Sequence, residues 1–474
     1  MLALPMPTGR TDEAALSGAL LAPLSDFVAA RLGLDFPEQR WRDLQRGIAA
    51  AAAEFGIADS EACARWLLSA DLERKHIEIL ASHLTIGETY FFREPGSLDA
   101  LRDHVLPELL RRRAGERELR VWSAGCSTGE EAYSLAILLD GLIPDAEKWN
   151  VTLLATDINP AFLRKAAAGI YGEWSFRGTP NWVRQRYFKE RKDGRLQLAA
   201  HIRARVTFSY LNLADDVYPS LLNSSNAQDV ILCRNVLMYF TPDRIKKISG
   251  NFHRCLIDGG WLIVSPTETS DSLFPGFAPV EFTGTFLYRK SDAAGRPPAS
   301  PSPLIPPLPA TALVAAPPSP PVANAPEAAT ALAQDAIESP AAAARRCANQ
   351  GRLAEALEWC AAALAADKLD PAHYYLQASV EQEQGRSEAA VCSLERALYL
   401  DPGFVLAHFA LGNIELSQGR RHQAERHYTR TLALLRSHAD DELLPEAEGL
   451  TAGRLAEIVG SLRAGLQRAE KGPA

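Results

Sequence analysis

Several features are missing from this chain of 474 residues, and each absence excludes a class of protein. There is no run of about 18 apolar residues and no signal peptide at the N-terminus, so we expect a cytoplasmic protein without direct membrane insertion. The seven cysteines lack C-x-x-C or Cys/His spacing, which predicts neither a disulfide framework nor a metal site. A net charge of −8 without a basic stripe argues against nucleic-acid binding.

A dinucleotide fingerprint is missing too, although a strand, a tight turn and a helix follow one another in the expected order. Residues 119–124 read as a buried strand, small residues follow from Gly125 to Gly129, and apolar residues then recur at helical spacing. Such a unit brings a helix N-terminus to the end of a strand, where a nucleotide-like ligand can lie against backbone amides. The stretch therefore predicts a cofactor site.

The residue types in this turn discriminate between two cofactor classes. Counting from Gly125, the second and third glycine positions of the fingerprint hold Ser127 and Glu130, which disfavours a pyrophosphate. The acidic pair Glu130 and Glu131 suits a ligand with ammonium and sulfonium charges, such as S-adenosylmethionine. Complementing the helix dipole is the alternative role of the two glutamates.

Strands and helices alternate along residues 151–290, which predicts an α/β, doubly wound, Rossmann-like fold with a mostly parallel sheet. Further strands are expected at residues 151–157, 206–213, 229–233, 261–265 and 286–289. Because parallel strands end at one edge of a sheet, we expect Gly125, Asp157, Asn212 and Asn235 to lie together. Residues 171–205, with a hairpin signal at Asp193-Gly194, predict a small inserted β lobe.

Two residues outside the turn have candidate roles with stated alternatives. Asp157 ends the second strand, where it can accept hydrogen bonds from both ribose hydroxyls. Capping the next helix is the alternative, but Asn159 before Pro160 suits that position better. Arg93 follows an aromatic cluster. Its aliphatic chain can pack on the rings and leave the guanidinium exposed, or the guanidinium can be a fixed cation in the wall of a pocket.

The C-terminal part is repetitive. Gly351, Gly385 and Gly419 lie 34 residues apart, each followed by Arg, which is the tetratricopeptide period. We predict an all-α repeat domain with a capping helix at 450–466, forming an independent protein-binding module. Twelve prolines between residues 297 and 326 indicate a linker that lets this module reach away from the rest. The expected domains are a helical 1–82, an α/β 83–292 with the lobe at 171–205, a linker 293–340 and repeats at 341–474.

Four segments together resemble the bacterial chemotaxis-receptor glutamate methyltransferases, the CheR family. They are Thr-Ile-Gly-Glu-Thr-Tyr-Phe-Phe-Arg-Glu, Trp-Ser-Ala-Gly-Cys-Ser-Thr-Gly-Glu-Glu, Ala-Thr-Asp-Ile-Asn and Cys-Arg-Asn-Val-Leu-Met-Tyr-Phe. The repeats resemble those of a subset that serves alternative chemosensory pathways, including one controlling biofilm formation. The resemblance implies S-adenosylmethionine as cofactor and a methyl-accepting chemoreceptor as partner, with a further protein partner for the repeats.

The resemblance also implies site residues. Arg93 and Tyr239 match residues nearest the transferring methyl, so they are the candidate catalytic residues. The candidate cofactor-binding residues are Gly87, Thr89, Arg93, Gly125, Glu131, Asp157, Asn212, Leu213, Arg234 and Asn235. Gly87 stands where some members have a cofactor-contacting Asn, and the N-terminal helix runs from Arg46 into alanines where members carry basic residues facing the receptor.

The expected reaction is the methylation of receptor glutamates, giving methyl esters and S-adenosylhomocysteine. A glutamate with a pKa of about 4.3 is already a carboxylate at neutral pH, so no general base is required. The alternative is a catalytically silent, cofactor-binding scaffold that acts through its repeats.

Overall fold

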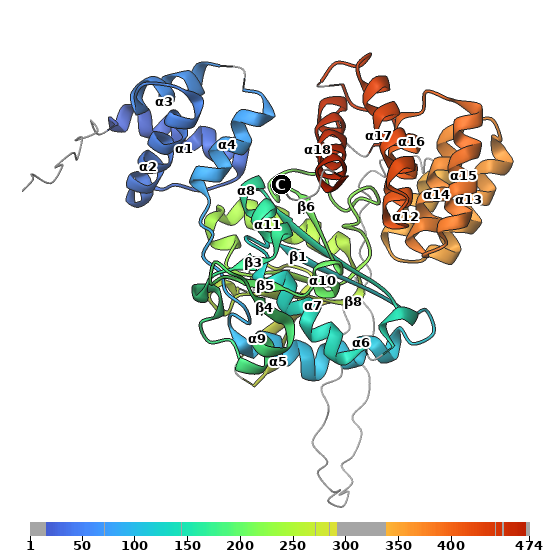
Figure 1. Ribbon diagram of the computed structural model, residues 1–474, viewed down its shortest axis with the longest axis horizontal. Coiled ribbons are helices and arrows are strands. Elements are labelled where there is room, and N and C mark those ends of the chain that lie inside the picture. The colour runs from blue at the N-terminus through green and yellow to red at the C-terminus, as the bar shows by residue number, and fades with distance from the viewer. Residues whose placement is uncertain are drawn as a thin grey trace, which may run out of the picture.

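The computed structural model of the chain (Figure 1) describes residues 16–70, 72–143, 145–270, 272–283, 285–291, 338–440, 442–447 and 450–470. Of the predicted linker at 293–340, only residues 338–340 are among them. No helix within these ranges is long and apolar enough to cross a membrane.

The central element is a seven-stranded sheet in the order β6-β2-β1-β7-β8-β10-β9. Its first five strands are parallel, whereas β10 and β9 run antiparallel to their neighbours. The predicted strands are all present, but β9 was missed. It contains Pro279, which argues against a strand in the sequence but is tolerated because β9 lies at the sheet edge. The bounds are β1 Glu118–Ala124, β2 Asn150–Asp157, β6 Val206–Tyr210, β7 Gln228–Cys233, β8 Leu256–Val264, β9 Phe277–Phe282 and β10 Thr285–Lys290.

Apolar clusters cover both faces of this sheet. Leu135 and Leu139 of α7 (Glu130–Leu142) pack on one face, and Ile248 and Phe252 of α11 (Pro242–Cys255) pack on the other. The doubly wound α/β class is therefore confirmed. The remaining helices near the sheet are α5 Pro95–Ala100, α6 Leu106–Arg112, α8 Pro160–Ala168 and α10 Ala200–Arg203.

A second, three-stranded sheet forms the inserted lobe, in the order β3-β5-β4. Its strands are β3 Ile170–Tyr171, β4 Phe188–Glu190 and β5 Leu196–Leu198, and α9 Asn181–Tyr187 precedes β4. The hairpin between β4 and β5 turns at Gly194, whose φ of +73° is the left-handed conformation that the Asp-Gly signal predicts. Trp174 and Trp182 of this lobe stay largely exposed.

The first helices of the described chain form a separate N-terminal group: α1 Gly18–Leu32, α2 Trp41–Phe55, α3 Ser60–Ser69 and α4 Arg74–Leu84. They enclose an apolar cluster of their own, which includes Leu24, Leu44 and Leu80. Ile158, just past β2, and Tyr239, just past β7, also pack against this cluster. The helices are therefore held beside the carboxyl edge of the parallel strands.

The C-terminal helices form three pairs and a final helix. Their second helices α13, α15 and α17 begin 34 residues apart, and the turns before them hold Gly351, Gly385 and Gly419 with positive φ. The bounds are α12 Pro340–Asn349, α13 Leu353–Ala366, α14 Pro371–Glu383, α15 Ser387–Leu400, α16 Val405–Ser417, α17 Arg421–Leu435 and α18 Ala452–Glu470. The repeat prediction and its register are thus reproduced.

These repeats contact the α/β part of the chain, which differs from the expected separation. The guanidinium of Arg120, on β1, forms an ion pair with Glu383 at the end of α14. Asn150, at the start of β2, donates its side-chain N–H to the backbone carbonyl of Glu383 at 3.3 Å. Both contacts lie at the amino ends of the parallel strands, opposite their carboxyl edge. The sequence could not predict this, because Arg120 reads as one polar residue within a buried strand.

Candidate functional site

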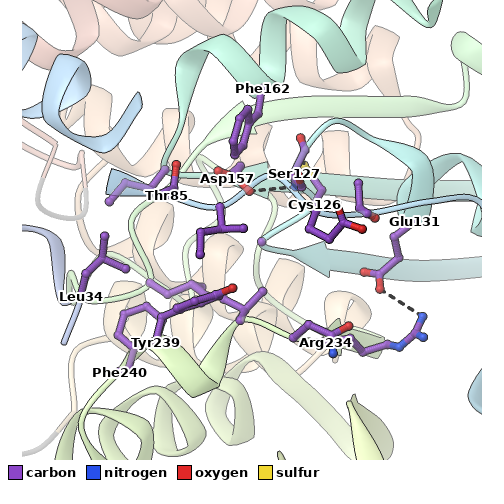
Figure 2. Close-up of a pocket in the computed structure, with 18 of the residues that line it drawn as sticks. Leu34, Thr85, Cys126, Ser127, Glu131, Asp157, Phe162, Arg234, Tyr239 and Phe240 are labelled. Atoms are coloured by element: carbon purple, nitrogen blue, oxygen red, sulfur yellow. Dashed lines mark hydrogen bonds and ion pairs between the residues drawn. The ribbon is translucent and has the colours of Figure 1, made fainter. Parts of the chain in front are cut away.

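A cavity lies at the carboxyl edge of the parallel strands and encloses about 1050 Å³, including open solvent at its mouth. Its walls come from the turns after β1, β2, β6 and β7, from the segment after α4 and from the N-terminal helical region. Figure 2 shows Asp157, Glu131, Arg234 and Tyr239 around it. A ligand can therefore touch four strand ends at once, as expected for a doubly wound sheet.

The turn after β1 can adopt its conformation only because of its small residues. Gly125 has a φ of +79°, and a Cβ there would lie 2.4 Å from Cγ2 of Val236, so any other residue would clash. Ser127 has a φ of +50° although it is not glycine. Its buried hydroxyl has no hydrogen-bond partner among the described residues. An unpaired buried hydroxyl in a cavity wall is available to a polar ligand.

Asp157 ties two strand ends together. Its Oδ2 accepts the backbone N–H of Ser127 at 2.8 Å, and its Oδ1 accepts the backbone N–H of Asn159 at 2.8 Å. Burial raises the pKa of the Asp157 carboxyl to about 6, although these hydrogen bonds act to lower it. The side chain of Asn159 accepts from the amides of Ala161 and Phe162 and caps α8, as expected. Asp157 is therefore free of the capping role and faces the cavity.

The two glutamates that begin α7 have separate environments. Glu131 lines the cavity, accepts the Ser123 hydroxyl at 2.7 Å and pairs with Arg234 at 3.2 Å. Burial raises the pKa of Glu131, and the nearby Arg234 opposes this rise. Glu130 is buried and accepts from the hydroxyls of Thr128 and Ser175. Glu131 is thus the one that a ligand can reach, which the sequence left undecided.

Arg234 holds together the segments that flank the cavity. Its side chain is 2% exposed, and besides Glu131 it pairs with Glu94 at 3.2 Å and donates to the backbone carbonyl of Arg93. Glu94 also accepts from Asn235 at 3.0 Å and from Ser265 at 2.9 Å. These bonds keep the pKa of Glu94 below its usual value despite its burial. Arg234 therefore stabilises the wall of the cavity through these contacts, and its charge is already paired with carboxylates.

The candidate catalytic residues lie in the same cavity wall. Tyr239 ends the short helix η5 (Leu237–Tyr239) and is half-buried. Burial raises the pKa of its hydroxyl, while the positive charges of Arg40 and Arg93 oppose the rise. The guanidinium of Arg93 lies 5.9 Å from the Tyr90 ring centroid and donates to the carbonyl of Glu88 at 2.7 Å. Arg93 therefore combines the two roles considered from the sequence, because its side chain lies near the Tyr90 ring and also lines the cavity.

All the predicted site residues except Gly87 line this cavity. A Cβ on Gly87 would lie 2.6 Å from the ring of Phe162, so Gly87 leaves room for that ring, which does line the cavity. Asn212 uses its side chain within the protein, donating to Asp215 at 3.1 Å and accepting from the amide of Ala214 at 3.0 Å. Its neighbour Leu213 contributes apolar surface.

Some lining residues were not predicted from the sequence. Phe36 and Arg40 come from the N-terminal helical region, for which no chemistry was expected. The Arg40 guanidinium lies 4.7 Å from the Phe36 ring centroid and 5.4 Å from that of Tyr239. Phe162 is on α8, five residues after Asp157. No sequence signal marks Arg40, because its distance from the strands in sequence conceals its position in space.

The site fits a nucleoside ligand that also carries positive charge. Two carboxyl groups, Asp157 and Glu131, face the cavity, and the Phe162 ring lies beside Asp157 (Figure 2). Three arginines, Arg40, Arg93 and Arg234, also line it, and Arg234 is paired with Glu131. A carboxylate can accept hydroxyl and ammonium groups, and an aromatic ring offers a surface for stacking. The fold and site together define the class of S-adenosylmethionine-dependent methyltransferases.

Comparison with known proteins specifies the family. Residues 87–282 match the family described as "CheR methyltransferase, SAM binding domain". Chemotaxis protein methyltransferase 2 of Vibrio cholerae is 35% identical over 216 residues, covering 46% of this chain and 74% of that protein. Chemotaxis protein methyltransferase 1 of Pseudomonas aeruginosa is 36% identical, covering 45% and 77% respectively.

A third relative extends over the repeats as well. The "probable biofilm formation methyltransferase WspC" of Pseudomonas putida is 29% identical over 413 residues, covering 83% of this chain and 93% of that protein. The chain therefore belongs to the CheR family of chemotaxis protein methyltransferases, and its cofactor is S-adenosylmethionine.

Proposed function

We propose that this protein methylates glutamate side chains in the cytoplasmic domain of methyl-accepting chemoreceptors and releases S-adenosylhomocysteine. The observation that carries the proposal is that Arg93 and Tyr239 face the same cavity as Glu131 and Asp157. Family membership supports methyl transfer, and the names of the relatives support a chemotaxis protein as the substrate.

The proposed cofactor-binding roles follow from charge and position. Asp157 accepts the ribose hydroxyls and Glu131 attracts the ammonium group. Thr89, Gly125, Asn212, Leu213 and Asn235 shape the cavity around the cofactor, and Arg234 fixes this wall through its carboxylate partners. Gly87 contributes indirectly, because its missing side chain lets the Phe162 ring reach the cavity.

S-adenosylmethionine supplies an electrophilic methyl group on its sulfonium. The protein's part is to bring a glutamate carboxylate into line and to exclude water from it. Arg93 and Arg40 are the cations nearest Tyr239, and together they can orient an incoming carboxylate. Tyr239 then narrows the space in which the methyl group passes. A general base is unnecessary because the carboxylate is ionised at neutral pH.

A second hollow gives a route for the substrate. It shares Phe36, Arg40, Leu84, Thr85 and Ile86 with the cavity and continues along α2 and α4 past Asp43, Arg46 and His83. A receptor helix lying here would place a glutamate next to Arg40. The exposed Arg46, which pairs with Asp43 in the same hollow, is a second cation along this route, in place of the larger basic set expected from the family.

The wider context is also proposed. The long match to a biofilm formation methyltransferase supports a role in a biofilm-related chemosensory pathway in the cytoplasm, with a further protein partner for the repeats. We propose domain limits at 1–82, 83–292, 293–340 and 341–474. Separate apolar clusters in the N-terminal helices and in the repeats support them.

Methyl transfer from labelled S-adenosylmethionine tests the proposal. Purified protein and chemoreceptor cytoplasmic fragments should give a base-labile methyl ester on glutamate. The Arg93→Ala variant should lose this ester, with a smaller loss of cofactor affinity. Micromolar cofactor binding without ester on any fragment, together with normal signalling by Arg93→Ala cells, would instead favour the catalytically silent scaffold.

A further inference from the structure

The segment between β6 and β7 contains a turn that its own polar side chains build. We call residues 219–226 the leucine turn. The Ser225 hydroxyl accepts the amide of Ser220 at 3.0 Å, and the Ser220 hydroxyl accepts the amide of Leu222 at 3.1 Å. Asn223 donates to the carbonyl of Val217 at 3.0 Å. These bonds are internal, so they leave the side chains of Leu221 and Leu222 available to other parts of the chain.

Both leucines pack against the repeats. Leu221 packs on the apolar cluster of the first helices, α12 to α14, and Leu222 packs on the cluster that runs from α14 to α18. The two residues therefore bridge the two apolar clusters of the repeat array. In Figure 1 the green segment that follows β6 reaches toward α18 and α12. Without the repeats, two adjacent leucines would be exposed to water.

A polar contact beside the leucines ties the same turn to the repeats. Arg120 donates its Nε–H to the carbonyl of Asn226 at 3.2 Å and an Nη–H to the carbonyl of Ser224 at 3.1 Å. Its other Nη–H pairs with Glu383 of α14. Arg120 is 4% exposed. Its guanidinium, which extends from β1, therefore connects the leucine turn to the repeats. The Glu383 side chain is only 10% exposed, so its carboxylate depends on this partner for much of its charge stabilisation.

The turns of the repeats fit closely against the same surface. A Cβ on Gly351 would lie 3.2 Å from Cγ2 of Ile257 and 3.3 Å from Cβ of Ala227. A Cβ on Gly385 would lie 3.7 Å from the side-chain amide nitrogen of Asn150, whereas a Cβ on Gly419 would have no atom of the described residues within 4 Å. The turns that hold Gly351 and Gly385 therefore lie against the α/β part, whereas the turn at Gly419 does not.

We propose that the leucine turn is the resident ligand of the repeat array, and that a protein partner occupies the same apolar surface only by displacing it. Stacked repeats use extended surfaces to bind other segments, and here the chain itself supplies one. A covalently tethered ligand acts at an effective concentration of about millimolar, so it competes strongly with a free one. A displacing segment would carry two adjacent apolar side chains in a turn of small polar residues.

The test measures binding of a fluorescent peptide, residues 217–226 of this chain, to the full-length protein. The double variant Leu221→Ser, Leu222→Ser removes the resident side chains and should bind the peptide at least about tenfold more tightly than the unsubstituted protein. Glu383→Gln should change affinity in the same direction, because it loosens the docking without altering the apolar surface. Leu443→Ser, at a leucine that is 64% exposed, is the matched control and should bind like the unsubstituted protein.

Small-angle scattering gives a second readout, since the maximum dimension should increase in both docking variants. Equal peptide affinity in all four proteins would overturn the proposal, as would an absence of binding by both docking variants. A peptide with serines at both leucine positions must not bind; if it binds as well as the original, the leucines are not the ligand.

Discussion

The carboxylate of Asp157 accepts the backbone N–H of Ser127 at 2.8 Å, which joins the end of β2 to the turn after β1. Both residues also line the cavity. The carboxyl group that is proposed to hold the cofactor ribose therefore also fixes the turn after β1, which lines the cavity.

Replacing Asp157 by alanine should weaken cofactor binding by about 1–3 kcal/mol, because ribose hydroxyls and the Ser127 amide both lose their acceptor. Titration calorimetry with S-adenosylhomocysteine measures this. Asp216→Ala, at an exposed aspartate outside the cavity, is the control. An unchanged affinity for Asp157→Ala would remove the ribose role.

Cofactor affinity should fall as the pH drops through about 6, because burial raises the pKa of Asp157 to about 6 and only its ionised form accepts two hydroxyls. The stability of the cofactor-free protein depends on this group with the opposite sign. Its folded pKa lies above the unfolded value, so its contribution favours the native state at pH 4 and is lost as the pH rises to 6. Asp157→Asn should remove the contribution of this carboxyl group to the pH dependence of both cofactor affinity and stability. If the variant's affinity depended on pH as that of the unsubstituted protein does, the assignment would be contradicted.

Arg93→Lys and Tyr239→Phe should lower kcat more than they change cofactor affinity, since both residues are proposed to act on the incoming carboxylate and methyl. Lysine keeps the charge but loses the planar, multidentate guanidinium. Steady-state methylation of a receptor fragment, with KM and kcat separated, is the measurement. If only the Kd for S-adenosylmethionine changed, the two residues would belong to the cofactor site alone.

Arg234→Met should destabilise the sheet region by about 2–4 kcal/mol, because it leaves the partly buried carboxylates of Glu131 and Glu94 without their cation. Urea denaturation followed by tryptophan fluorescence reports this. The control is Arg65→Ala, which breaks an exposed pair with Glu61 and should cost less than about 1 kcal/mol. Equal effects of the two substitutions would rule out a wall-building role for Arg234.

Ending the chain at residue 291 should leave cofactor affinity unchanged, because none of the described residues between 338 and 470 lines the cavity. The shortened protein should nevertheless aggregate more readily, since Leu221 and Leu222 lose their cover. Serine at both positions should restore solubility, as measured by light scattering. Loss of cofactor binding in the soluble shortened variant would mean that the repeats support the catalytic core.

Local sequence patterns were sufficient for the elements whose signals are short-range. The strand, glycine turn and helix around Gly125 follow from residue size and hydrophobic period, and the 34-residue spacing of Gly351, Gly385 and Gly419 specifies the repeats. The edge position of Asp157 follows as well, because parallel strands must end together. The missed strand β9 shows the limit, since Pro279 is acceptable only where a neighbouring strand is absent.

Tertiary structure alone decided which distant residues meet. Arg40 reaches the Tyr239 ring, and Glu383 reaches Arg120, across about 200 or more residues of sequence, because buried apolar clusters dock one part of the chain on another. It also separated Glu130 from Glu131, since only one position of the first helical turn faces the cavity. Sequence therefore determined the cofactor site and the repeat period, whereas packing determined the second wall of the site and the docking of the repeats.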